Sequence, residues 1–384
     1  MLGVFAATSA VAARSPTAAE RADAFFEPAC QLFRTWLVPI FAPGLISLPL
    51  SMPALRASDL CGFLLLVAIG VASSTTTNAA VASLLAPDDG LAAAAAAAPA
   101  SAPQPDPFPR AQRICLVAGA LLFGTLHLVG GATSAPALTL CLLCTTLGSF
   151  SVATSACPPR LQLWLHPFVT CTGVTLLTIG AIGAISGRGA RDVLQAYATP
   201  WGGAGALLAE LMGPAVVSFA FTLYRFRSLL WARLHQLLGT AAIGSLLGML
   251  SAVSAARAIG MDPVLRVALV GRNTLSPLAF EAAKLVGVEP ALGMLGAFAS
   301  GLIGICAGKP LLAWLRVTDP AVRGLALSGA AHGGALLALG DEPAALPFAA
   351  LMMSLGAACT IALLSLRPVR SLVLTAALGR GASI

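Results

Sequence analysis

The sequence predicts an all-α polytopic membrane protein, and three observations carry that prediction. Charged residues make up only 10% of the 384 residues, whereas a soluble domain carries about 25%. Hydrophobic residues reach 58%, and the mean hydropathy is +0.90. Apolar stretches recur along the chain, and a span with its loop takes roughly 30 residues, so the length accommodates about 11–12 transmembrane or re-entrant helices.

This composition excludes several classes of protein. A soluble enzyme, a nucleic-acid-binding protein and a disordered chain would all need more charged surface. The net charge of +7 is therefore interpreted as loops that face the cytosol or stroma and anionic lipid headgroups, and not as a nucleic-acid surface. The 9 cysteines lie mostly in apolar runs and are interpreted as small buried hydrophobes, so neither a metal nor another cofactor is expected.

The N-terminal part of the chain is divided by composition. Residues 1–24 are rich in Ala, Ser and Arg and resemble the end of an organelle transit peptide, with a plain disordered start as the alternative. Residues 25–86 predict a two-span unit. Its first span, 29–50, contains three prolines, which predict a kink. The second span, 60–86, is interrupted by the polar stretch SSTTTN at 73–78.

A change of composition then marks a boundary. Residues 87–111 combine six prolines, an alanine run and three aspartates, which is typical of a linker. The larger domain, 112–384, follows it. Continuous spans are predicted there at 112–130, 133–156, 161–186, 204–224, 234–258, 291–315 and 346–366.

Two further apolar segments of this domain are broken near their middle. Residues 265–287 and 320–340 each carry a central cluster of Gly, Pro, Ser, Thr, Asn or His, and shorter interruptions occur at 166–173 and 211–214. In lipid, non-helical backbone survives only inside protein or beside a wet cavity. A half-helix that starts at such a break offers free N–H groups to a carboxylate. The paired spacing of the breaks predicts two inverted structural repeats.

The first broken segment holds the most informative run of residues. Pro277 is placed to open a half-helix, and Asn273, Thr274 and Ser276 offer polar side chains beside the free amides. Arg272 is costly in an apolar segment and needs either an anionic ligand or an acidic partner. The alternative is a proline kink whose freed carbonyls are satisfied by Ser and Thr.

Three other features extend this candidate site. Glu281 shares a helical face with Pro277, although pairing with Lys284 is the alternative. His332 lies in the second break beside Gly333 and Gly334, where it is suited to carry a proton or bind a carboxylate. A buried neutral histidine bonded to a carbonyl is the alternative reading.

Weaker candidates occupy the other two interruptions. These are His166 with Thr170, and Gly213 with Pro214; a helix start at the membrane interface explains His166 equally well. The sequence contains no HExxH, GxSxG or P-loop motif. The chain is therefore not expected to be an enzyme.

Several stretches resemble a known family of membrane proteins, LrgB/CidB. They are 205–230, 271–292, 319–339 and 342–374, and the last is similar to the plant and algal branch, the plastidal glycolate/glycerate translocators. Residues 25–86 resemble the LrgA-like segment that is fused ahead of LrgB in that branch. The resemblance implies that 112–384 is an LrgB-like transport domain.

The sequence departs from the family at two places. The family's Lys/Arg-Ser-Val-Thr-Thr-Pro run keeps its cation and proline here but has Leu275 in place of the first threonine. The family's Thr-Ala-Ser-His run becomes Gly-Ala-Ala-His and ends at His332 with two hydroxyls fewer. Fewer donors leave a related organic anion open as the substrate.

The resemblance implies a multi-pass transporter of small hydroxycarboxylates, glycolate and glycerate, in the chloroplast inner envelope during photorespiration. Transport would proceed by exchange or with a coupled proton. Arg272 would neutralise the carboxylate. Its oxygens would be bound by Asn273, Thr274 and Ser276, and His332 with Glu281 would handle the proton or make a second contact. The partners are then the lipid bilayer and the organic anion, with a homo-oligomer left open. The alternative is a holin-like or regulatory membrane protein without a saturable site.

Overall fold

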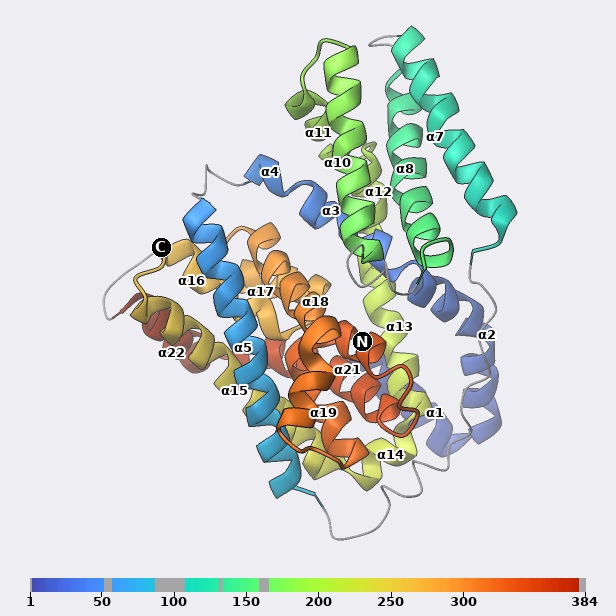
Figure 1. Cartoon of the computed structure of the whole chain (residues 1–384). Helices are drawn as coiled ribbons and strands as arrows, with labels where there is room; N and C mark the ends of the chain where they lie inside the picture. Colours follow the sequence, from blue (N-terminus) through green and yellow to red (C-terminus); the bar gives the residue numbers. More distant parts are fainter. Residues whose placement is uncertain (1, 52–56, 87–107, 131–133, 159–165, 380–384) are drawn as a thin grey trace. The chain divides into compact units, whose positions relative to one another are not determined.

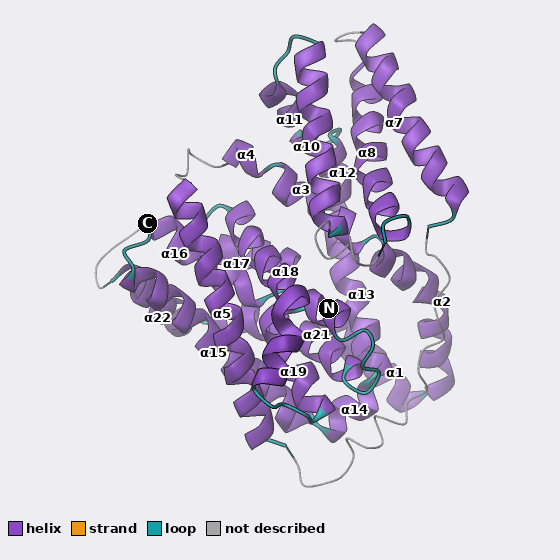
Figure 2. Cartoon of the chain, in the orientation of Figure 1, coloured by secondary structure: helices purple, strands orange, loops and turns teal. Residues whose placement is uncertain are grey.

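The chain is helical wherever its structure is described. The computed structural model describes residues 2–51, 57–86, 108–130, 134–158 and 166–379, and all regular structure in these ranges is helix (Figures 1 and 2). The predicted linker falls almost wholly outside the described residues. Because every backbone N–H and C=O in a helix finds a partner within its own segment, this architecture suits a bilayer.

Eight helices are long and apolar enough to cross a membrane, among the residues described. A ninth candidate is a pair of helices bent by 42° near residue 36, close to the predicted proline kink. The prediction of a polytopic membrane protein is thereby confirmed. The eight are α5 (Ala57–Leu84), α7 (Arg110–Gly130), α8 (Ala135–Ser155), α10 (Pro167–Ile185), α12 with α13 (Ala204–Glu210, Met212–Arg225), α15 (Leu234–Ala258), α18 (Pro290–Trp314) and α21 (Leu346–Ser365).

Shorter helices fill the remaining positions. Several are halves of the segments predicted to be broken, which is why they fall below the length of a full span. They are α1 (Leu2–Arg14), α2 (Pro16–Thr35), α3 (Leu37–Ile46), α4 (Leu48–Ser51), α11 (Ala190–Ala198), α14 (Arg227–Ala232), α16 (Pro263–Ala268), the 3-10 helix η2 (Leu269–Asn273), α17 (Ser276–Val286), α19 (Pro320–Ala331), α20 (Gly333–Ala338) and α22 (Arg367–Leu378).

Contacts divide the chain into two compact units. The first unit comprises Met1–Asp23, Ala54–Ser101 and Phe219–Ile384, and the second comprises Ala24–Pro53 and Ala102–Ser218. These units do not coincide with the segments predicted from composition. The difference arises because α5 packs against α19, α15 and α18 rather than against its sequence neighbours.

The second unit is built from α3, α7, α8, α10, α11 and α12. An aromatic cluster holds its helices: the ring centroids of Trp36 and Phe108 are 4.8 Å apart, and those of Phe108 and Phe150 are 5.5 Å apart. Tyr197 is fully buried and lies against Gly205, where a β-carbon would collide with its ring. The edge-on pairs of Phe108 with Trp36 and Phe150 stabilise the unit beyond the effect of the apolar area that they bury.

The first unit has a core shared by α5, α15, α19 and α21 (Figure 1). Fully buried Leu237, Leu325 and Phe348 form part of it. Ser245 donates to the carbonyl of Gly356 at 3.2 Å, which ties α15 to α21. Membrane helices are not driven together by the hydrophobic effect, because lipid is as apolar as their side chains. Close packing at small residues and hydrogen bonds between helices hold them together instead.

Ion pairs and a helix cap hold the N-terminal end of α19. Both oxygens of Glu342 accept from Arg323 at 2.7 Å, and Lys309 pairs with Asp341 and Glu342. Asp319 caps α19 by accepting from the backbone N–H of Val322 at 2.9 Å.

We expect Glu342→Gln to lower the free energy of unfolding by about 1 kcal/mol, because the two charge-assisted bonds to Arg323 are replaced by at most one bond to a neutral oxygen. The hydrogen bonds from Arg323 hold the pKa of the Glu342 carboxyl below its ordinary value of 4.5. A lowered pKa stabilises the fold above about pH 4.5, and this stabilisation is lost as the pH falls through the folded-state pKa. Thermal unfolding in detergent should therefore show the variant and the parent converging at acid pH.

Asp341→Asn is the matched control, because the Asp341 side chain is 74% exposed. It should change stability by less than about 0.5 kcal/mol. Equal losses in the two variants at neutral pH would contradict the role given to the Arg323–Glu342 pair.

Candidate functional site

The first broken segment ends one helix and starts another within a few residues. Helix α16 continues into η2, whose last residue is Asn273. Thr274 and Leu275 are extended, with φ/ψ of −132°/166° and −64°/142°. Pro277 then lies in the first turn of α17, where its missing N–H costs nothing. The break predicted at 272–277 is confirmed.

The second broken segment turns at His332. Helix α19 ends at Ala331, and α20 begins at Gly333. Between them His332 has φ 39° and ψ −112°, a region that residues with a side chain rarely adopt and that costs on the order of 1–3 kcal/mol. The break predicted at 329–334 is thus also confirmed.

A hydrogen bond joins the two breaks. The Nε2 atom of His332 lies 2.9 Å from the backbone oxygen of Arg272, at the end of η2. A carbonyl oxygen only accepts, so Nε2 is the donor and carries a proton. Two interruptions that are 60 residues apart in sequence therefore meet inside the first unit.

Arg272 is the most unusual side chain at this junction. It is 0% exposed, and its Nη2 atom donates to Ser74 Oγ at 3.0 Å and to the Gly248 carbonyl at 3.3 Å. Its Nε and Nη1 atoms have no partner. Among the residues that the structure describes, no carboxylate lies within ion-pair distance of it. A buried cation without a counter-charge is costly, and a bound anion would offset that cost.

Helix α5 supplies one wall of the site. Ser74 also accepts from Asn273 Nδ2 at 3.3 Å, and Asn78, one turn later, donates through Nδ2 to the Ala326 carbonyl of α19 at 3.5 Å. A β-carbon at Gly70 would lie 2.8 Å from the Nε and Nη1 atoms of Arg272. Ser74 and Asn78 were not among the predicted site residues, although the polar stretch at 73–78 was the available signal.

Further polar atoms at the junction have no partner. They are the side-chain oxygens of Asn78, Asn273 and Thr274, and all three residues are buried. Ser276 is half-buried and Pro277 is buried at the start of α17. The site therefore combines one buried cation with several unsatisfied oxygens, which suits an anion that also carries hydroxyl groups.

Two of the predicted residues make structural contacts. Glu281 is exposed and pairs with Lys284 at 3.1 Å, which is the alternative that the sequence left open. Gly334 packs against the backbone of Gly301 on α18.

The weaker candidates lie in the second unit. His166 is the N-cap of α10 and accepts from the N–H of Phe168 at 3.3 Å. Burial lowers the pKa of His166, which favours the neutral ring that this bond needs. Gly213 and Pro214 are exposed in the first turn of α13. His166 thus caps a helix, and Gly213 and Pro214 start one.

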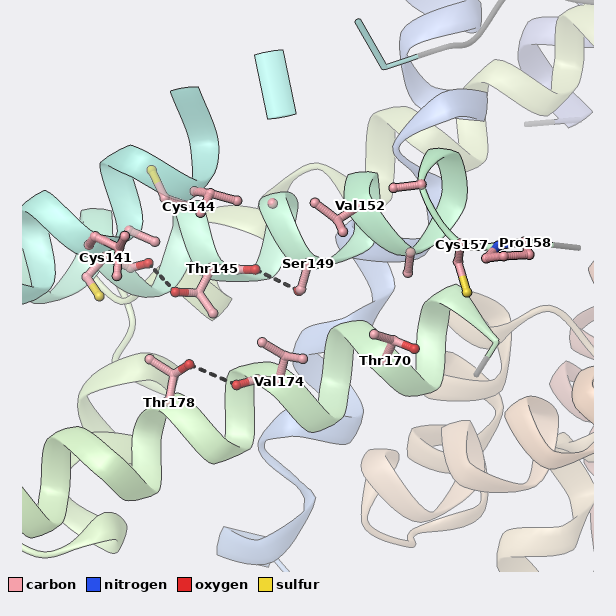
Figure 3. A pocket seen from close by; sticks show the side chains of 16 residues that line it. Cys141, Cys144, Thr145, Ser149, Val152, Cys157, Pro158, Thr170, Val174 and Thr178 are labelled. Atoms are coloured by element: carbon pink, nitrogen blue, oxygen red, sulfur yellow. Dashed lines mark hydrogen bonds between the residues drawn. The ribbon is translucent and has the colours of Figure 1, made fainter. Parts of the chain in front are cut away.

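The second unit also contains a cavity of about 610 Å³ between α7, α8 and α10 (Figure 3). Thr170 lines it, but no charged side chain does. The hydroxyls of Thr145, Ser149 and Thr178 donate to carbonyls of their own helices at 2.7–2.9 Å. These groups are already satisfied, so the cavity offers little to an anion.

Comparison with known proteins gives the chain a context. The model of the LrgB-like family matches residues 146–368. Plastidal glycolate/glycerate translocator 1, chloroplastic, of Arabidopsis thaliana is 28% identical over 360 residues, covering 88% of this chain and 67% of that protein. Uncharacterized protein YxaC of Bacillus subtilis is 30% identical over 123 residues, 32% of this chain and 54% of its own length.

A third relative carries a different description. Antiholin-like protein LrgB of Bacillus cereus is 26% identical over 128 residues, covering 33% of this chain and 56% of that protein. The chain thus spans just over half the length of these bacterial relatives. No solved structure matches the chain.

The matched segment contains Arg272 and His332, whereas α5 with Ser74 and Asn78 lies ahead of it. The two helix breaks and the buried cation therefore belong to the part of the chain that the family model describes. Since residues 146–368 are more than half of the sequence, this chain belongs to the LrgB-like family.

Proposed function

We propose that the chain is a secondary transporter of small hydroxycarboxylates, glycolate and glycerate, in the inner envelope of the chloroplast. The observation that carries the proposal is Arg272, a fully buried cation without a carboxylate partner in the described residues, at the meeting point of two broken helices. Transporters place substrate sites at such breaks. The plastidal glycolate/glycerate translocator among the relatives supports the substrate and the compartment.

The geometry suggests how an anion would be handled. The substrate carboxylate accepts from the guanidinium of Arg272, whose Nε and Nη1 atoms have no partner. The side-chain oxygens of Asn273 and Thr274, which also lack a partner, are further polar groups for the substrate. Because all these groups are buried, a substrate reaches them only when neighbouring helices separate, as alternating access requires. His332 joins the two breaks and is the candidate for a coupled proton.

A second candidate function has its own support. The antiholin-like relatives favour a holin-like or regulatory membrane protein without a saturable site. Such a protein would need no buried cation at a helix break. The plastidal relative is named a translocator, which supports transport over catalysis.

We expect the full chain in proteoliposomes to take up labelled glycolate with saturation, and excess unlabelled glycerate should compete for that uptake. Parallel assays at two pH values test proton coupling, since a coupled proton makes the rate depend on the pH gradient. Protein-free vesicles are the control. Uptake that rises linearly with concentration and resists competition would favour the holin-like function instead.

A further inference from the structure

We infer that Asn78 of α5 accepts a hydrogen bond from the substrate hydroxyl, so that the site selects 2-hydroxycarboxylates over 2-oxocarboxylates. This inference rests on the proposed transport function and deepens it, because a cationic, hydroxyl-lined site alone does not distinguish lactate from pyruvate. The selecting residue lies outside the segment that the family model matches.

The position of Asn78 is tightly fixed. Its side chain is 0% exposed and sits between Gly244 of α15 and Gly329 of α19, where an added β-carbon would collide with the amide on either side. Two helices therefore come close to α5 because these positions carry no side chain. The amide has little freedom to rotate away.

The orientation of the amide follows from its partner. Nδ2 lies 3.5 Å from the carbonyl oxygen of Ala326, and a carbonyl can only accept, so the NH2 group must face it. The Oδ1 atom then faces Gly244 of α15, and it has no hydrogen-bond partner. An unpaired buried carbonyl oxygen calls for a donor.

The spacing along α5 suits a short substrate. Ser74, which accepts from Arg272 at 3.0 Å, lies one turn before Asn78 on the same face of α5, and one helical turn rises about 5.4 Å. A carboxylate held by Arg272 can therefore direct a hydroxyl two or three atoms away toward Asn78. A two- or three-carbon hydroxy acid fits this spacing.

Chemistry then provides the selection. The hydroxyl of lactate or glycerate donates to Oδ1, whereas the oxo group of pyruvate has no proton and would place two acceptors together in a buried site. Such a mismatch costs on the order of tenfold to a hundredfold in apparent affinity.

The experiment measures competition for labelled glycolate uptake by the full chain in proteoliposomes. Pyruvate should inhibit the parent at least about tenfold more weakly than lactate. Pyruvate is the correct probe because glyoxylate is largely hydrated in water and then carries hydroxyls. Asn78→Ser should admit pyruvate and bring the lactate-to-pyruvate ratio close to one, since a hydroxyl donates as well as accepts. Asn78→Ala removes the acceptor and should narrow the ratio as well.

Ser245→Ala is the matched control, because it removes another buried polar group that ties α15 to α21 and should leave the ratio unchanged. Equal inhibition of the parent by lactate and pyruvate would overturn the inference, and so would an unchanged ratio in a folded Asn78→Ser variant. The parent result stands even if a variant fails to fold. If the parent protein shows no saturable glycolate uptake, the proposed transport function is refuted instead.

Discussion

Replacing Arg272 with glutamine should lower saturable glycolate uptake at least about a hundredfold, the largest effect expected of any single substitution. The substrate carboxylate would lose the guanidinium charge and up to two charge-assisted hydrogen bonds, each worth roughly 1.5–3 kcal/mol. Arg272→Lys keeps the charge but loses the planar set of donors that also reaches Ser74 and Gly248, so an intermediate loss is expected. Initial uptake rates in proteoliposomes measure both.

The stability of the Arg272→Gln variant is equally informative. Because the guanidinium is buried without a carboxylate among the described residues, removing its charge also removes a desolvation cost. The melting temperature in detergent should therefore stay the same or rise while uptake is lost, as is common where a site is maintained at the expense of stability.

Arg257→Gln is the control for this pair of measurements. Arg257 lies in the last turn of α15 and donates to the Thr375 carbonyl at 3.2 Å from an exposed position. The same chemical change there should alter uptake by less than about twofold. If vesicles that contain the Arg272→Gln variant retain full saturable uptake, the assignment of Arg272 to substrate binding is refuted.

Local sequence was sufficient to locate the two helix breaks. Pro277 favours the first turn of a helix, and a cluster of glycine and histidine inside an apolar segment destabilises a continuous helix. The same kind of signal occurs at His166 and Pro214, where the polar residue and the proline lie at helix starts. A polar cluster in an apolar segment therefore reports a change in the backbone, but not whether a ligand uses it.

The residues that contact Arg272 could not be predicted from the local sequence. Arg272 meets His332 across 60 residues and Ser74 across 198, and only tertiary packing brings them together. The polar stretch at 73–78 was read as an interruption, yet α5 runs unbroken through it. In a continuous helix the polar side chains must be satisfied by neighbouring helices, and the sequence does not say which.

The second large effect concerns Gly334, predicted as a site residue on the strength of its position beside His332. We expect Gly334→Ala to lower the free energy of unfolding by about 1–3 kcal/mol, because the new β-carbon would collide with the backbone of Gly301 and a backbone cannot move aside as a side chain can. Helix α20 would then be pushed away from α18. Thermal unfolding in detergent measures the loss.

Gly333→Ala provides the neighbouring control, because no atom lies within 4 Å of a β-carbon added there. The two variants separate packing from ligand contact. If Gly334 serves the close approach of α18 and α20, Gly334→Ala loses stability and uptake together, whereas Gly333→Ala keeps its stability or gains slightly from alanine's helix propensity. Normal stability with lost uptake in Gly334→Ala would instead place Gly334 against the substrate. The backbone contact with Gly301 favours the first result, since the structure already gives this glycine a reason to lack a side chain.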